Sequence, residues 1–223
     1  RMAYEAGLYG WLIRRDRIEL SEADPKLLSY GMKASLTGVT GNLQSRADRF
    51  IVGTVYGFDD LGIFGAARAI MVPLKQVLLI YRQLYIPKLA NKSPAEALRL
   101  THRALLFGVL LAIPFLAAAY LAIPPVFDFF LGKFEGSSTY ARWFLLVFFA
   151  GFPFTFYFAH FRSQRQARRE IVVRLARAVV MVLALVVLMY YYGIMGVIYA
   201  EIVATAFMSA HSWFEARKSR GAE

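Results

Sequence analysis

Three cations lie seven residues apart in a stretch, 61–90, whose other residues are typical of a membrane-spanning helix: Arg68, Lys75 and Arg82. Seven residues make nearly two helical turns, so the three side chains form one stripe about 21 Å long at ~1.5 Å per residue. A Lys or Arg at mid-membrane costs roughly 2.5–3.5 kcal/mol on insertion scales. The stripe therefore indicates a wet cavity that receives an anion, unless the segment does not span a membrane.

Other polar side chains extend this candidate anion site. Gln76 follows Lys75 directly and widens the polar face of the helix. Arg46 and Arg49 are three residues apart in the preceding predicted helix, so they share a face, and one of them can join the cavity.

Two acids, Asp48 and Glu201, lie well inside predicted spans. Asp48 can pair with Arg49 or across to Arg68, and a purely structural pair and a functional role are equally open. Glu201 can couple transport to protons, but a simple partnership with a tyrosine or an arginine is the favoured interpretation. Two acids do not neutralise three or more cations, which favours a solvated cavity over a closed set of ion pairs.

The sequence shows none of the constellations that carry covalent catalysis or metal binding. There is no Ser/His/Asp set, no pair of carboxylates facing a pocket, no phosphate-binding glycine loop and no cluster of metal ligands. The chain has no cysteine, which excludes disulfides and thiolate chemistry. We therefore expect a protein that is not an enzyme and holds no metal or other cofactor.

Composition favours a membrane protein. The chain is 58% hydrophobic, against about 45–50% in an ordinary soluble domain. Its net charge of +11 could suit nucleic acid, but the basic residues cluster between apolar blocks, so no nucleic-acid partner is expected. The basic run over 162–177 is instead expected to mark topology and to contact anionic membrane lipids.

The apolar and helical patterns predict an all-α membrane protein with six transmembrane helices: about 27–56, 61–90, 101–124, 141–162, 170–191 and 194–215. Residues 1–26 are predicted to be the end of a preceding helix and a cytoplasmic linker, and 216–223 a cytoplasmic tail. Pro73 lies inside a predicted span, where it favours a kink. The Phe-rich span 141–162 is expected to provide lipid-facing and packing surface.

The distribution of charged loops supports this count and gives an orientation. Cations concentrate in every second connection: 14–26, 88–103, 162–174 and 217–220. The alternate connections hold acids, a balanced Lys133 and Glu135, or no charge near Gly193. The positive-inside rule then predicts a multi-pass protein with both ends of this segment in the cytoplasm.

Five short motifs follow one another along the chain: ADRFIVG at 47–53, LGIFGAA at 61–67, PKLA at 87–90, FLGKF at 130–134 and GIMGVIYA at 193–200. Together they resemble polysaccharide flippases, the Wzx-like members of the multidrug/oligosaccharidyl-lipid/polysaccharide exporter superfamily. The resemblance covers nearly all of 26–215. Phe64 stands where the family usually has Tyr.

This resemblance implies one lobe, the C-terminal one, of a two-lobe transporter with twelve or more helices, whose partner is the N-terminal lobe of the same chain. Such a transporter works by alternating access. It moves an undecaprenyl-pyrophosphate-linked oligosaccharide across a bacterial or archaeal cytoplasmic membrane, for surface polysaccharides such as the O-antigen of lipopolysaccharide. The stripe of three cations falls where the central cavity of such a protein would be lined.

Two other functions are consistent with the same residues. A cation-coupled multidrug exporter of the same superfamily would be expected to use acidic cavity residues, which the basic stripe disfavours. A non-transporting scaffold of an envelope-assembly complex would keep the stripe dry and paired with a partner's acids.

Overall fold

A computed structural model describes residues 48–132, 134 and 136–218, and these residues form helices joined by short connections, without a strand among them. The described residues all belong to one of the two units into which the chain divides, 37–223. The predicted linker 1–26, most of the first predicted span 27–56 and Arg46 lie outside the described residues.

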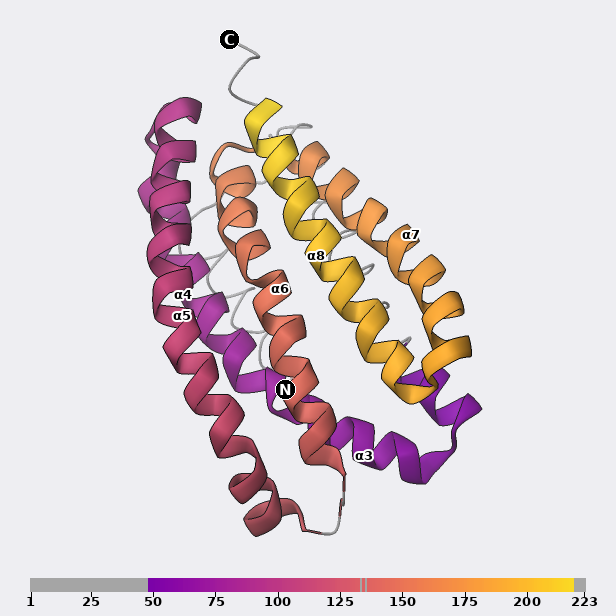
Figure 1. The fold of residues 1–223 in the computed structure, drawn as a ribbon. Coiled ribbons are helices and arrows are strands. Elements are labelled where there is room, and N and C mark those ends of the chain that lie inside the picture. The colour runs from indigo at the N-terminus through magenta and orange to yellow at the C-terminus, as the bar shows by residue number, and fades with distance from the viewer. Residues whose placement is uncertain (1–47, 133, 135, 219–223) are drawn as a thin grey trace, which may run out of the picture. The chain divides into compact units, whose positions relative to one another are not determined.

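The described part begins with a helical segment over 48–55. Six helices follow (Figure 1): α3 (Phe58–Ala69), α4 (Met71–Ala90), α5 (Pro94–Leu131), α6 (Ser137–Ser163), α7 (Ala167–Tyr192) and α8 (Ile194–Lys218). Within the described residues, five stretches are long and apolar enough to cross a membrane: Phe58–Ala90, Pro94–Phe130, Ser137–Ser163, Ala167–Tyr192 and Ile194–Lys218. This length and composition are those of a multi-pass membrane protein, as predicted.

The stretch predicted as one helix over 61–90 is broken at Ile70, between α3 and α4. Pro73 explains the position of the break. It has no N–H to donate to the carbonyl of Ala69, and its ring crowds that carbonyl. Ile70 itself keeps helical torsions, with φ −61° and ψ −25°. The chain therefore changes direction without a loop, as Figure 1 shows.

The helix α5 begins at Pro94, earlier than the predicted start at 101. The hydroxyl of Ser93 accepts a hydrogen bond from the backbone N–H of Glu96 at 3.3 Å, and Pro94 fills the first helical position. A serine cap followed by proline is a strong helix start, because it satisfies or removes the unpaired first donors.

The centre of the packing is α6, which contacts every other helix from α3 to α8 and lies between α5 and α8 in Figure 1. Phe144, Phe148, Phe152 and Phe156 recur every four residues, so they share one face, and all four are buried. The expectation of a partly lipid-facing Phe-rich span holds for Phe149, which is exposed. The other phenylalanines named here form core.

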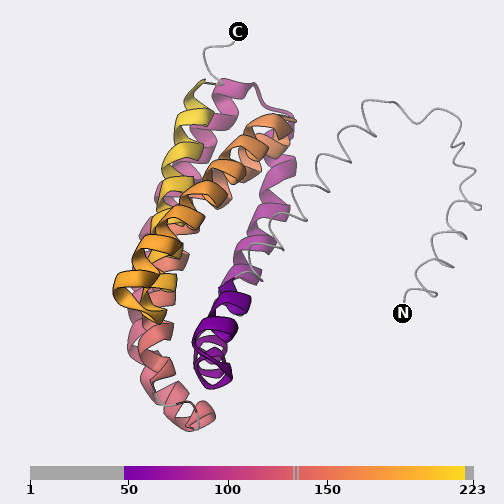
Figure 2. The same ribbon diagram turned by 90° about the vertical axis from the view of Figure 1, so that its right-hand side faces the viewer.

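The helices α7 and α8 run side by side as a hairpin, as Figure 2 shows. Gly193 makes the turn with a positive φ of 58°. Gly196 passes so close to α7 that a Cβ built on it would lie 2.1 Å from the carbonyl oxygen of Leu188. On the outer face of α7, Val182 and Val186 are exposed, as suits a lipid-facing surface.

A side-chain amide joins two connections at one end of the helices. Nε2 of Gln164, after α6, donates to the carbonyl of Leu89 at 3.1 Å and to that of Lys92 at 3.4 Å. The α4–α5 and α6–α7 connections therefore lie together. The predicted topology puts both of them on the same side of the membrane.

Candidate functional site

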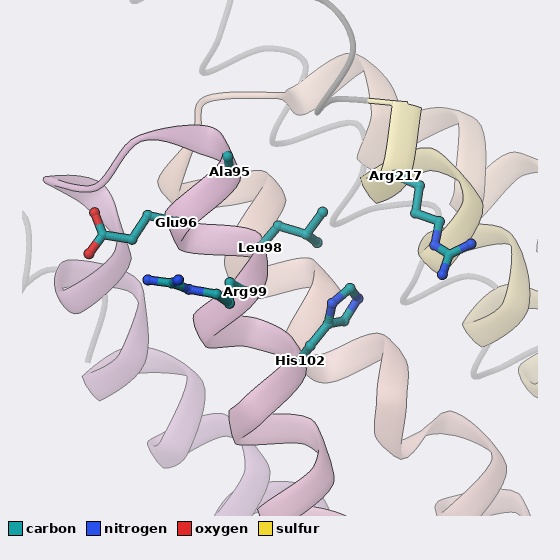
Figure 3. Close-up of a pocket in the computed structure, with 6 residues that line it drawn as sticks. All are labelled: Ala95, Glu96, Leu98, Arg99, His102 and Arg217. Atoms are coloured by element: carbon teal, nitrogen blue, oxygen red, sulfur yellow. The ribbon is translucent and has the colours of Figure 1, made fainter.

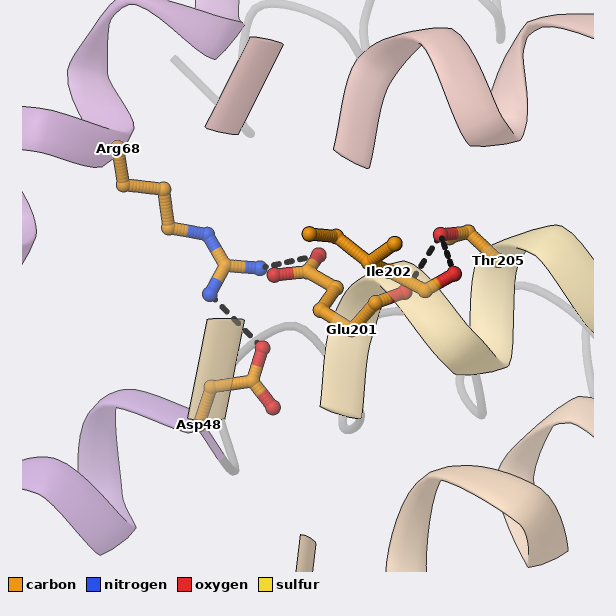
Figure 4. Close-up of polar contacts among 5 residues, drawn as sticks. All are labelled: Asp48, Arg68, Glu201, Ile202 and Thr205. Atoms are coloured by element: carbon orange, nitrogen blue, oxygen red, sulfur yellow. Dashed lines mark hydrogen bonds and ion pairs between the residues drawn. The ribbon is translucent and has the colours of Figure 1, made fainter. Parts of the chain in front are cut away.

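A buried arginine stands between two acids from different elements (Figure 4). Nη1 of Arg68 donates to Oδ2 of Asp48 at 2.8 Å, and its Nη2 donates to Oε1 of Glu201 at 3.3 Å. Exposed fractions are 3% for Asp48, 7% for Arg68 and 4% for Glu201. Removing such charges from water costs several kcal/mol per ion, so only mutual pairing makes this burial tolerable. We call these three residues the ion triad.

The ion triad depends on the packing of three elements. Asp48 belongs to the segment 48–55, Arg68 to the last turn of α3 and Glu201 to α8. The guanidinium carbon of Arg68 lies 5.9 Å from the ring centre of Phe64 and 5.8 Å from that of Phe144. These two rings meet edge to face and form an apolar wall that holds the guanidinium in place.

Glu201 is incompletely satisfied. Its Oε2 is buried and has no hydrogen-bond partner among the described residues, although Oε1 is paired with Arg68. One turn further along α8, the hydroxyl of Thr205 donates to the backbone carbonyls of Glu201 and Ile202 (Figure 4). Glu201 therefore keeps one free acceptor beside the arginine.

Two further cations act on the ion triad from other helices. Lys75 of α4 and Arg177 of α7 each interact electrostatically with Asp48, Glu201 and Arg68. With the ion triad they make what we call the charge cluster. It holds three cations and two acids drawn from five helical elements. Among these five described residues the cations outnumber the acids by one, a balance that suits an anionic ligand.

The predicted stripe of cations is divided by the break at Ile70. Arg68 lies before the break and is buried in the ion triad, whereas Lys75 lies after it on an exposed position of α4. Arg82 lies outside the charge cluster, and its guanidinium carbon is 4.3 Å from the ring centre of Phe158. Of the three cations in the predicted stripe, Arg68 and Lys75 thus interact with the acids.

The remaining predicted residues have simpler surroundings. Gln76 is exposed next to Lys75. Arg49 is exposed, so of the two predicted partners of Asp48 the structure selects Arg68. The pairing of Glu201 with an arginine is the interpretation that the sequence favoured.

Arg177 is the member of the charge cluster that the sequence did not single out. It lies at the end of the basic run 162–177, whose composition suggests contact with lipid headgroups. It follows Arg174 by three residues, as another member of the run, and this spacing does not predict that it approaches the acids. The feature of the sequence that could have indicated this role is the position of Arg177 beyond the first turns of the helix, next to an apolar stretch.

A pocket of about 800 Å³ opens elsewhere, between the start of α5 and the end of α8. Its described lining includes Glu96, Arg99, His102 and Arg217, whose side chains Figure 3 shows. It shares no residue with the charge cluster. No group of three His, Cys, Asp or Glu side chains suited to a metal ion occurs within 48–132, 134 and 136–218.

Comparison with known proteins gives two matches. A family model described as "Polysaccharide biosynthesis protein" matches residues 8–138. The amylovoran biosynthesis protein AmsL of Erwinia amylovora is 33% identical over 97 residues. That alignment covers 43% of this chain and 24% of the relative, so the matched part spans about a quarter of that protein's length. No solved structure matches.

Proposed function

Because the chain belongs to the polysaccharide biosynthesis protein family, we propose that it is the C-terminal lobe of a Wzx-like flippase. The substrate would be an undecaprenyl-pyrophosphate-linked oligosaccharide, moved across a bacterial cytoplasmic membrane for surface polysaccharide synthesis. The protein would act by alternating access together with an N-terminal lobe, without covalent chemistry and without a cofactor.

The exposed Lys75, which interacts electrostatically with the buried ion triad, is the observation that carries this proposal. Lys75 lies well inside the stretch Phe58–Ala90, where a free ammonium is costly against lipid. It interacts electrostatically with Arg177 and Arg68 as well as with the two acids. A pyrophosphate would balance these cations. Charge-assisted contacts to it are worth about 1.5–3 kcal/mol each.

The ion triad gives the cluster a way to change state. Arg68 is held by two acids at 2.8 and 3.3 Å, and Glu201 has the longer of the two contacts. A bound pyrophosphate would compete with Glu201 for the cations and weaken that contact between α3 and α8. An anion that binds one arrangement of helices more tightly than the other shifts the population toward it.

Export of the glycan by the intact protein tests the proposal. Lys75→Ala is expected to abolish surface polysaccharide and to cause lipid-linked oligosaccharide to accumulate, while the amount of protein in the membrane is unchanged. Lys88→Ala is the matched control, because Lys88 is an exposed cation near the end of the same helix. Normal surface polysaccharide in cells that carry only Lys75→Ala would refute the proposal.

A further inference from the structure

Three arginines converge on one buried aromatic ring, away from the charge cluster. The guanidinium carbons of Arg82, Arg162 and Arg174 lie 4.3, 4.7 and 5.0 Å from the ring centre of Phe158. They come from α4, α6 and α7, so only the packed helices bring them together. Phe158 is 1% exposed and forms a fixed floor beneath the cations. We call these three residues the arginine cluster.

One acid serves the three cations of this arginine cluster. Glu170 is buried and accepts from Nε of Arg162 at 3.2 Å and from Nε of Arg174 at 3.0 Å. Arg82 forms no ion pair with any described residue, yet it interacts electrostatically with both other arginines and with Glu170. Positive charge therefore remains in excess, and an anion would offset it.

The uncommitted part of each guanidinium has the geometry that phosphate requires. Arg162 and Arg174 both reach Glu170 through Nε, and the terminal NH₂ groups of neither arginine hydrogen-bond to a described residue. These side chains are 36% and 27% exposed, so a ligand can reach them. The planar fork of donors on a guanidinium matches two oxygens of a phosphate group.

The position of the arginine cluster suits a membrane lipid. Arg162 lies in the last turn of α6, directly before the connection in which Gln164 contacts Leu89 and Lys92. Ends of membrane helices lie at the depth of the headgroups, where lipid phosphates are found. Arg82 and Arg174 lie further from the ends of their helices and would contact the phosphate from the side that faces the membrane interior.

We propose that Arg82, Arg162 and Arg174 bind the phosphate group of an anionic lipid over the ring of Phe158. The phosphate can belong to a phospholipid headgroup or to the diphosphate of a lipid-linked glycan, because both present the same oxygens. Only the second source rests on the proposed transport function. The site has no residue in common with the charge cluster, and binding at it does not depend on transport.

Lipid binding to the intact purified protein tests this site. The probes are phosphatidylglycerol, undecaprenyl diphosphate and diacylglycerol, which lacks phosphate; bound lipid is counted by native mass spectrometry. Arg82→Gln is expected to weaken binding of at least one phosphate-bearing lipid by about tenfold, the size of one lost charge-assisted contact. It leaves the pairs of Glu170 intact. Arg168→Gln, at an exposed position of α7, removes the same charge outside the arginine cluster and is expected to change binding less than twofold.

A variant that is expected to bind lipid more tightly keeps the test independent of folding defects, because a misfolded protein would lose binding. Glu170→Gln removes the competing carboxylate and is expected to tighten binding of the same lipid. Loss of phosphatidylglycerol alone in Arg82→Gln identifies a headgroup site, and loss of undecaprenyl diphosphate alone identifies the glycan carrier. The proposal is overturned if Arg82→Gln binds both phosphate-bearing lipids as tightly as Arg168→Gln does. It is also overturned if the unsubstituted protein binds diacylglycerol as tightly as it binds the phosphate-bearing lipids.

Discussion

Arg68 and Glu201 are 133 positions apart in the sequence, and their side chains meet at 3.3 Å in a site almost closed to solvent. This contact connects the end of α3 to α8, while the second contact of Arg68 connects α3 to the segment that contains Asp48. One guanidinium thus connects the first and the last helical elements of the described chain, the segment 48–55 and α8.

Removal of the arginine is expected to destabilise the fold strongly. Arg68→Ala removes the one cation that hydrogen-bonds to both buried carboxylates among the described residues, a change that costs roughly 3–5 kcal/mol in comparable buried pairs. The measurement is thermal unfolding of the purified intact protein in detergent. Arg49→Ala, which removes an exposed arginine next to Asp48, is expected to melt close to the unsubstituted protein. Equal melting temperatures for the two variants would contradict the structural role of Arg68.

The neighbourhood of Lys75 is expected to be wet. The chain contains no cysteine, so once any cysteine elsewhere in the intact protein is replaced, Lys75→Cys provides a single thiol for a water-soluble maleimide. We expect rapid labelling there, slowed by added pyrophosphate. Val182→Cys, on the exposed apolar face of α7, should label slowly because lipid covers it. An unreactive thiol at 75 would favour a dry scaffold instead of a transporter.

Two glycines are expected to respond oppositely to the same substitution. At Gly196 a Cβ would meet backbone atoms of Leu188 at 2.1 and 2.4 Å, and backbone cannot move aside. Gly196→Ala should therefore separate α7 from α8 and cost at least the roughly 1–3 kcal/mol typical of overpacking. At Gly65 no described atom lies within 4 Å of the added Cβ. Gly65→Ala should instead gain about 0.5–1 kcal/mol of helix stability. Thermal melting of the two variants measures the difference.

The break at Ile70 is expected to matter for transport more than for stability. Pro73→Ala restores a donor for the carbonyl of Ala69 and lets α3 and α4 run as one straight helix. We expect an unchanged or higher melting temperature together with reduced glycan export, because Lys75 would move away from its position near the ion triad. Pro114→Ala is the control, since α5 continues through Pro114 without a break. Full export by Pro73→Ala would show that the bend is dispensable.

The helical class and the membrane character of this chain could be predicted because they depend on composition and on apolar runs of sufficient length. The break at Ile70 was also within reach of the sequence, since Pro73 fixes which carbonyl loses its donor. Asp48 and Arg68 are close enough in sequence to be named as candidate partners. These features are local, and local features follow from residue types and spacing.

The meeting of Arg177 and Lys75 with Glu201 could not be predicted in the same way. For Arg177 it depends on how closely α7 packs on α8, to which Gly196 contributes although it has no charge and no side chain. For Lys75 it depends on how α4 and α8 both pack on α6. The arginine cluster around Phe158 has the same origin, because its members come from three helices. The heptad spacing of Arg68, Lys75 and Arg82 on one predicted helix suggested a single site. In the packed structure Arg68 and Lys75 belong to the charge cluster, whereas Arg82 belongs to the arginine cluster.

The side chain of Gln164 has a mechanical consequence. Its amide joins the last residues of α4 and the α4–α5 turn to the end of α6, so these segments form a single block at one rim of the helices. Turns outside this block rely on Gly57, Gly136 and Gly193, each with a positive φ. A rearrangement of the helices that preserves the Gln164 contacts must carry α4, α5 and α6 as one body at that rim, so relative motion between them is confined to the rest of their length.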